Sequence, residues 1–289
     1  MPGMQDLKQF LCSMARNAVW LSIAGGDGPE VGHFGGLPDV PPDFVWPYFE
    51  TDTFDDDTVK PRPLSFLAQF DCTALAELDR DGLLPREGVL SLFYEMGSQR
   101  GGFDPQDAGC ARVYWFPEGA ALHPAPFPED LPDFGRLSRF PIRGASEADY
   151  PAYQDAESAM PDKDFPEKAS MFDQYDEVVA ALRKEERNGA LHKLLGWPNI
   201  IQNNMTQECE LVSRGHYCGS TWNRIPAEDR REAEQTSLEK WRLLFQLDSF
   251  TQGEFFLDFG DCGSIYFYIR TEDLAARRFD RVWLIMQCY

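Results

Sequence analysis

The chain carries the stretch LSFLAQFD at residues 64–71 and the similar stretch WRLLFQLD at residues 241–248. Each precedes a run that opens on glycine, GVLSLFY at 88–94 and GSIYFY at 263–268. Gln246 follows Gln69 by 177 residues, and Gly263 follows Gly88 by 175. Short apolar runs rich in aromatic residues and bounded by turn signals are typical of buried strands. The repetition predicts an internal duplication in which two related halves build one core.

Two weaker echoes extend this pattern. The run from Val282 to the end resembles the strand predicted over 111–116, and LLGWP at 194–198 resembles GLP at 36–38. We therefore predict a single domain with repeat halves at about residues 20–116 and 194–289, joined by a proline-rich connector over 117–170 and a helix over 171–188. The connector is expected to lie across the surface as extended chain. A further helix is expected over 5–18, from its apolar stripe. Regular alternation of strands and helices is missing, so the predicted fold class is α+β, mainly β: an antiparallel, strand-rich roll with a few short helices.

The charge of the chain limits its partners. The 289 residues include 27 Lys and Arg against 48 Asp and Glu, which gives a formal net charge of −21. Such a surface repels phosphate backbones and anionic lipid, so we expect no nucleic-acid or membrane partner. It attracts basic proteins and speeds their encounter. The simpler interpretation is that the acidity keeps the protein soluble.

The cysteines and the start of the chain indicate the compartment. Seven Cys are scattered without a C-x-x-C pair, which favours a reducing environment without disulfides. The first residues lack the basic and apolar regions of a signal peptide, and no window approaches 18 uninterrupted apolar residues. We expect a cytoplasmic location.

The repeated Gln and Asp residues allow two interpretations. Gln69 with Asp71, and Gln246 with Asp248, each face one side of a strand, and a pseudo-twofold could bring the two Asp together as a cation site or an acid/base pair. The structural alternative, in which Asp caps a turn and Gln satisfies backbone groups, is favoured.

Other candidate constellations are weaker. Cys262, between Asp261 and Gly263, would need a base to act as a nucleophile, and no His stands at a recognised spacing, so a tight turn is favoured. Cys209, His216 and Cys218 do not form a closed zinc pattern. Asp52 with Asp55–Asp57 lacks the spacing of an EF-hand, and Gly25–Gly28 does not match a nucleotide-binding loop. We predict no catalytic residue, metal or cofactor.

The motifs together resemble the YwqG-like proteins, a bacterial family of unknown function. The resemblance runs from about residue 7 to the end and is closest over GDCGSIYFYI at 260–269 and WLIMQCY at 283–289. It implies a compact, strand-rich roll and brings no established catalytic residue, cofactor or substrate. Relatives also resemble proteins encoded beside bacterial polymorphic toxins, which suggests an immunity role.

Three hypotheses follow from the sequence. The first is a non-enzymatic module whose acidic surface binds a basic protein, possibly as immunity toward a basic toxin. The second is a small-molecule-binding protein or hydrolase that uses acids in a cleft between the halves, and the third is a housekeeping scaffold. Trp46 and Trp197 follow the two Gly-Pro loops and are expected near that cleft. The candidate cleft or motif residues are Gly36, Pro38, Trp46, Gln69, Asp71, Trp197, Gln246, Asp248, Asp261, Gly263 and Tyr266.

Overall fold

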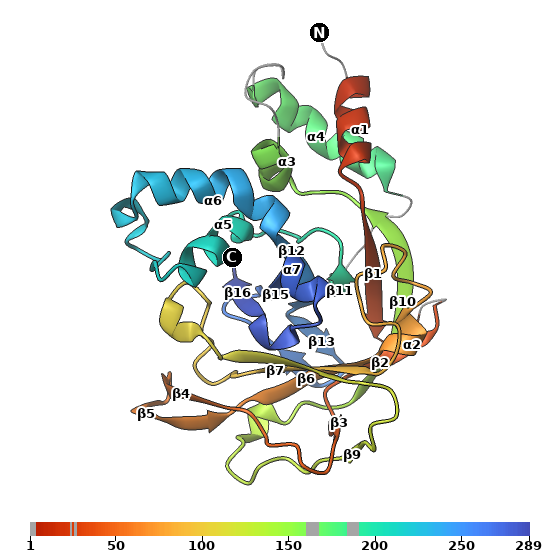
Figure 1. Cartoon of the computed structure of the whole chain (residues 1–289), viewed down its shortest axis with the longest axis vertical. Coiled ribbons are helices and arrows are strands. Elements are labelled where there is room, and N and C mark those ends of the chain that lie inside the picture. The colour runs from red at the N-terminus through yellow and green to blue at the C-terminus, as the bar shows by residue number, and fades with distance from the viewer. Residues whose placement is uncertain (1–3, 24, 26–27, 160–167, 184–190) are drawn as a thin grey trace.

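A ten-stranded antiparallel sheet forms the body of the protein (Figure 1). The computed structural model describes residues 4–23, 25, 28–159, 168–183 and 191–289. The strand order is β16-β15-β12-β11-β1-β10-β2-β6-β7-β8. The predicted fold class, mainly β with antiparallel pairing, is confirmed. The ten strands are β1 (Arg16–Ile23), β2 (Glu30–Phe34), β6 (Ser65–Asp71), β7 (Val89–Tyr94), β8 (Ala111–Phe116), β10 (Phe140–Asp149), β11 (Lys193–Leu195), β12 (Trp241–Asp248), β15 (Ser264–Arg270) and β16 (Trp283–Gln287).

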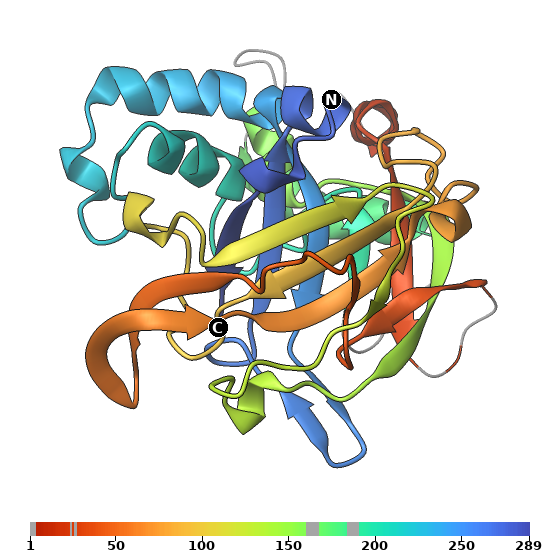
Figure 2. The ribbon, with the colours of Figure 1, turned by 60° about the horizontal axis from the view of Figure 1, so that its bottom comes forward.

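The sheet curves around one main core, as Figure 2 shows. β6 and β12 are buried almost throughout because both faces of these strands are covered. Phe70 and Phe245 meet inside the curve with ring centroids 5.5 Å apart. Phe66 faces a separate aromatic cluster on the outside of the sheet. The uninterrupted apolar runs in the sequence follow from this burial on two sides.

The two sides of the sheet are arranged alike around its centre, so that β8, β7, β6 and β2 on one side correspond to β16, β15, β12 and β11 on the other. β2, β6, β7 and β8 lie on one side of the central β1–β10 pair, and β11, β12, β15 and β16 lie on the other. The two central strands cross between the sides, since β1, near the start of the chain, pairs with β11, and β10, from the segment between the halves, pairs with β2. The register also shifts at matching places, between Phe66 and Ala68 in β6 and between Leu243 and Phe245 in β12. The duplication itself stays a prediction, because topology does not record ancestry.

Helices cover one end of the sheet. α5 and α6 pack on each other and on β12, while α1 packs on α4. The described helices are all too short or too polar to span a bilayer. Their bounds are α1 (Met4–Ser13), α2 (Cys72–Leu75), α3 (Tyr153–Ala159), α4 (Lys168–Leu182), α5 (Met205–Ser213), α6 (Ala227–Lys240) and α7 (Thr271–Ala275).

Three short two-stranded ribbons complete the fold. Two of them pair β3 with β9 and β13 with β14. The third, a hairpin of β4 and β5, projects from the body at the lower left of Figure 1. The bounds are β3 (Asp39–Val40), β4 (Tyr48–Thr53), β5 (Asp56–Pro63), β9 (His123–Pro124), β13 (Phe250–Gln252) and β14 (Phe255–Leu257).

Several expected elements differ from the structure. The helix expected over 5–18 ends at Ser13, and β1 begins at Arg16. The connector expected as extended chain on the surface contains β10, at the centre of the sheet. The prolines in this segment are a misleading sign of irregular chain. Pro141 has no N–H to donate, but β1 ends opposite Ile142 and needs no hydrogen bond from Pro141. On its other side Pro141 pairs with β2. The helix expected over 171–188 is α4, and residues 184–190 lie outside the described chain.

Candidate functional site

The repeated glutamines bind equivalent loops in the two halves. The Gln69 side chain accepts a hydrogen bond from Asp39 N (3.1 Å) and donates to Asp39 O (2.8 Å). Gln246 accepts from Asn199 N (2.9 Å) and donates to Leu191 O (2.9 Å). The amide of Gln69 therefore satisfies backbone groups of the segment that leaves β2, and the amide of Gln246 joins the segment that leaves β11, at Asn199, to the chain just before β11, at Leu191. This arrangement corresponds to the structural interpretation of the Gln residues.

The loops held in this way share an unusual backbone. Gly35 and Gly36 have φ values of 54° and 77°, and Leu195 and Gly196 have 59° and 72°. A Cβ atom at Gly36 would lie 2.8 Å from the Arg139 side chain, and one at Gly196 would lie 2.6 Å from Asp149 Oδ2. Glycine is required at both second positions by the left-handed backbone and by the close approach.

A buried ion pair joins the two sides of the sheet beside the second loop. Lys193 Nζ lies 2.8 Å from Asp149 Oδ2, and both side chains are 1% exposed. The same oxygen accepts a hydrogen bond from Trp197 N at 2.9 Å. Lys193 also lies over the ring of Trp20, 4.3 Å from its centroid. Burial lowers the pKa of Lys193, and Asp149 opposes that effect. β10, β11 and the following loop are therefore held together across β1.

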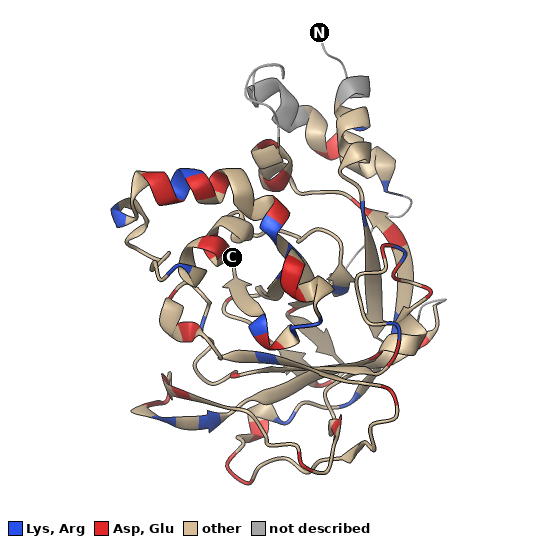
Figure 3. Cartoon of the chain, viewed as in Figure 1, with Lys and Arg blue, Asp and Glu red and all other residues tan. Residues whose placement is uncertain are grey.

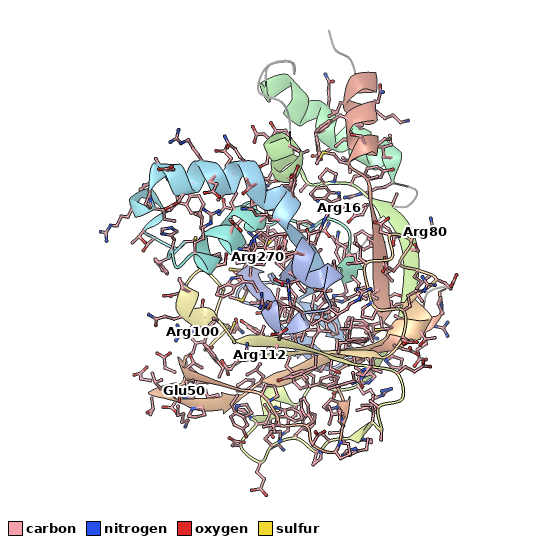
Figure 4. The ribbon with its side chains drawn as sticks, viewed as in Figure 1. Arg16, Glu50, Arg80, Arg100, Arg112 and Arg270 are labelled. Carbon is pink, nitrogen blue, oxygen red and sulfur yellow. The ribbon has the colours of Figure 1, made fainter. Side chains whose placement is uncertain are left out.

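Arg16 lies next to this network, where α1 leads into β1 (Figure 4). Its guanidinium carbon is 3.3 Å from the centroid of the Trp197 ring. The indole of Trp197 donates to Met14 O at 2.9 Å, which fixes the ring. Burial and the nearby Arg242 lower the pKa of Arg16 to about 9. The positive charge of Arg16 is thus poorly compensated in its surroundings.

A cavity of about 260 Å³ opens at this point, and we call it the seam cavity. The guanidinium groups of Arg16 and Arg242 both line the seam cavity. Within the described residues neither of them makes an ion pair or a hydrogen bond. Burial lowers the pKa of Arg242, and the charge of Asp81 opposes that shift. Asp81 itself accepts a hydrogen bond from Asn17 N at 3.0 Å. The lining comprises Ala15, Arg16, Asn17, Asp81, Leu83, Leu195, Gly196, Arg242 and Leu243.

The candidate acids lie elsewhere. Asp71 is exposed and caps α2 by accepting hydrogen bonds from Thr73 N and Ala74 N. Asp248 accepts from Leu191 N (2.5 Å) and Ser264 Oγ (2.6 Å). Neither carboxylate lines the seam cavity.

The remaining motif residues make structural contacts. Asp261 lies in an exposed turn whose carbonyl accepts a hydrogen bond from Tyr289 N. A Cβ at Gly263 would come within 2.2 Å of Gln287 O. Tyr266 donates its hydroxyl hydrogen to Asn199 O at 2.6 Å. Trp46 donates to Leu64 O and packs in the outer aromatic cluster, away from the seam cavity. The backbone carbonyl of Pro38 accepts a hydrogen bond from Ala125 N.

The weaker constellations do not assemble a site. Cys209 and Cys218 lie in different apolar clusters, and His216 pairs with Asp229. Within the described residues no group of three potential ligands is arranged to hold a metal ion.

The sequence did not predict the charged residues in and beside the seam cavity. Arg16 was expected inside a helix and Asp149 inside a surface connector, so their proximity could not be anticipated. Lys193 did carry a signal, because it follows Leu191 and His192 and precedes two leucines, so leucines lie close to it on both sides. A charged residue in such a run requires a buried partner.

These features define a mainly β protein with a polar seam beside its central strands. The chain belongs to the DUF1963 family, described as a domain of unknown function, whose model matches residues 32–288. No curated protein matches the chain.

Proposed function

We propose that this DUF1963 protein is a binding protein whose seam cavity takes a small anion, such as a carboxylate or a phosphate. The observation that carries the proposal is the pair Arg16 and Arg242, two guanidiniums on one cavity whose pKa values burial lowers although nearby acids oppose that shift, and neither of which forms an ion pair within the described residues. Their planar forks suit carboxylate and phosphate oxygens. An anion between them would relieve their mutual repulsion. This is a form of the small-molecule hypothesis in which arginines, and not the motif acids, bind the ligand.

The test is a thermal and calorimetric titration with phosphate and succinate, against sodium chloride at equal ionic strength. At ten times Kd a ligand stabilises the native state by about 1.4 kcal/mol. Arg242→Gln should abolish this gain, while Arg231→Gln, on the exposed surface of α6, should retain it. If both variants respond to phosphate and succinate like the parent, the seam cavity binds no anion.

A second candidate function is docking of a basic protein on the projecting β4–β5 hairpin. Phe54 and Val59 are 81% and 66% exposed there. The hairpin carries five acidic and two basic residues, which are Glu50, Asp52, Asp55, Asp56 and Asp57, with Lys60 and Arg62. Asp56 forms ion pairs with Lys60 and Arg62, and Asp52 forms one with Arg100. Elsewhere acidic residues are spread over helices and loops (Figure 3), whereas the hairpin combines them with exposed apolar side chains. A basic partner with an apolar patch complements both features. The resemblance to YwqG-like proteins extends this proposal to immunity toward a basic toxin.

A lysine- and leucine-rich amphipathic peptide is a suitable probe for the hairpin. Phe54→Ser with Val59→Ser should weaken its binding at every salt concentration, and Asp55→Asn with Asp57→Asn should reduce the salt dependence. Glu228→Asn with Glu234→Asn on α6 changes the net charge equally and serves as the control. Equal losses in the two charge variants, with no loss in the Phe54→Ser and Val59→Ser variant, would mean that the peptide responds to overall charge and that the hairpin is not a docking site.

A further inference from the structure

A second cavity, of about 430 Å³, lies at the start of α5. Its walls come from the residues that lead into α5, from the first turn of that helix and from the turn after Cys218. The chemistry of these walls is mixed: amide groups, one carboxyl group and one indole ring. The residues that supply them are Asn203, Asn204, Gln207, Glu208 and Trp222. We call this space the α5 cavity.

Glu208 is the one ionisable acid among the residues that line the α5 cavity. It is 5% exposed, and its Oε2 atom has no hydrogen-bond partner among the described residues. No Lys, Arg or His in the described part of the chain forms an ion pair with it. An acid buried without compensation costs free energy, so its retention calls for a partner that the protein alone does not supply.

Glu210, two residues further along α5, has the opposite environment. It contacts Arg214, Lys240 and Arg270 at 2.7 to 3.0 Å. Burial alone would raise the pKa of Glu210, but hydrogen bonds from Lys240, Trp241 and Arg214 lower it to about 2. The fold thus compensates one buried acid of this helix completely and leaves the other facing a cavity without a cation.

We propose that the α5 cavity binds a small organic cation, an alkylammonium or guanidinium compound, with Glu208 as its counter-ion. The half-buried indole of Trp222 would supply an aromatic wall, which attracts cations through the ring quadrupole. The amides of Asn203 and Gln207 would hydrogen-bond polar groups of the ligand. The net charge of −21 raises the local concentration of cations around the protein. This site is separate from the anion site proposed at the seam, and it does not depend on that proposal.

The scaffold of the α5 cavity is fixed before a ligand arrives. Asn204 caps α5 by accepting hydrogen bonds from Thr206 N and Gln207 N. The amide of Asn204 donates to Asp155 Oδ1 at 2.6 Å, which ties the start of α5 to α3. Preorganisation of this kind lowers the entropy cost of binding.

The protonation of Glu208 gives the proposal a distinctive readout. Burial raises the pKa of Glu208 to about 8, so at pH 7 the carboxyl is mostly protonated when the cavity is empty. The other titratable groups that face it are the thiols of Cys209 and Cys218, whose pKa values burial also raises, so they remain neutral. A cation favours the carboxylate, so binding should release close to one proton at pH 7. Affinity should rise up to tenfold per pH unit below pH 8 and level off above it.

The experiment titrates the full chain with propylammonium and with tetramethylammonium chloride at pH 6, 7 and 9, followed by calorimetry. Propanol, which has no charge, is the matched control ligand. Glu208→Gln should weaken binding at pH 9 at least tenfold and remove the pH dependence. Trp222→Leu should weaken binding several-fold with the pH dependence intact, and Glu234→Gln on the exposed side of α6 should have no effect.

Two results would overturn the proposal. One is binding of propanol as tight as that of the ammonium compounds, and the other is an unchanged affinity in Glu208→Gln. Because this substitution removes an uncompensated carboxyl and keeps its shape, the variant should fold at least as well as the parent. Thermal unfolding of the variant checks this directly.

Discussion

Replacing Lys193 by methionine would leave the carboxylate of Asp149 buried without its ion-pair partner. Both side chains are 1% exposed and their charged atoms are 2.8 Å apart, so water cannot solvate the remaining charge. Asp149 would keep hydrogen bonds from Trp197 N and Tyr150 N, which compensate it only in part. Removing one member of a buried pair costs about 3–5 kcal/mol. We expect Lys193→Met to lower the free energy of unfolding by that amount at pH 8.

Urea denaturation measures this loss, and two comparisons make it specific. Lys60→Met breaks a pair whose side chains are 52% and 35% exposed, so it should lower the free energy of unfolding far less than Lys193→Met does. Asp149→Asn, added to Lys193→Met, removes the buried charge but can still accept from Trp197 N, so it should restore much of the stability.

The reasoning would be refuted by a Lys193→Met variant within 1 kcal/mol of the parent at pH 8. It would also be refuted if Asp149→Asn destabilised the Lys193→Met variant further. Either result would mean that the side chains at the seam are hydrated and that the pair does not hold β10 to β11.

Three further predictions concern stability. Gly196→Ala should lower the free energy of unfolding clearly more than Gly253→Ala does. Both glycines have a positive φ, but only a Cβ at position 196 would contact Asp149 and Ala18. Equal shifts in the urea midpoint of the two variants would contradict this. Gln246→Leu should cost about 2–3 kcal/mol in the same assay, since buried loop groups lose their partner, and a cost below 0.5 kcal/mol would count against the clamp. Burial raises the pKa of Asp155 to about 7, so its folded state binds the proton more tightly than the unfolded state between pH 4 and 7. Stability should fall as pH rises through that window, and Asp155→Asn should flatten the fall in thermal melts. An unchanged pH slope in the variant would exclude Asp155 as its source.

Part of the fold could be predicted from local pattern. The runs at 64–71 and 241–248 form β6 and β12, and the glycine-led runs after them form β7 and β15. These strands are apolar on both faces because both faces are covered, and a continuous apolar run in the sequence is enough to predict such burial. Strand β10 was missed because prolines dominate its neighbourhood.

The candidate site was predictable only where the sequence repeats. Gln69 and Gln246 were singled out by repetition, and both bind equivalent loops. Arg16 and Arg242 do not repeat, and 225 positions separate them. Glu208 looks like any helical surface acid in the sequence, and only its burial distinguishes it.

The sequence by itself determined the class of fold, the antiparallel pairing and the glycines that immediately precede β7 and β15, because these depend on neighbours within a few residues. Only the tertiary structure decided that β1 and β10 cross between the halves, that Lys193 meets Asp149, and that one acid of α5 is compensated while the other is not. Charge compensation depends on distance in space. Because β1 and β10 cross between the two sides of the sheet, charged groups that are far apart in the sequence come into contact, and their separation in the sequence does not predict that contact.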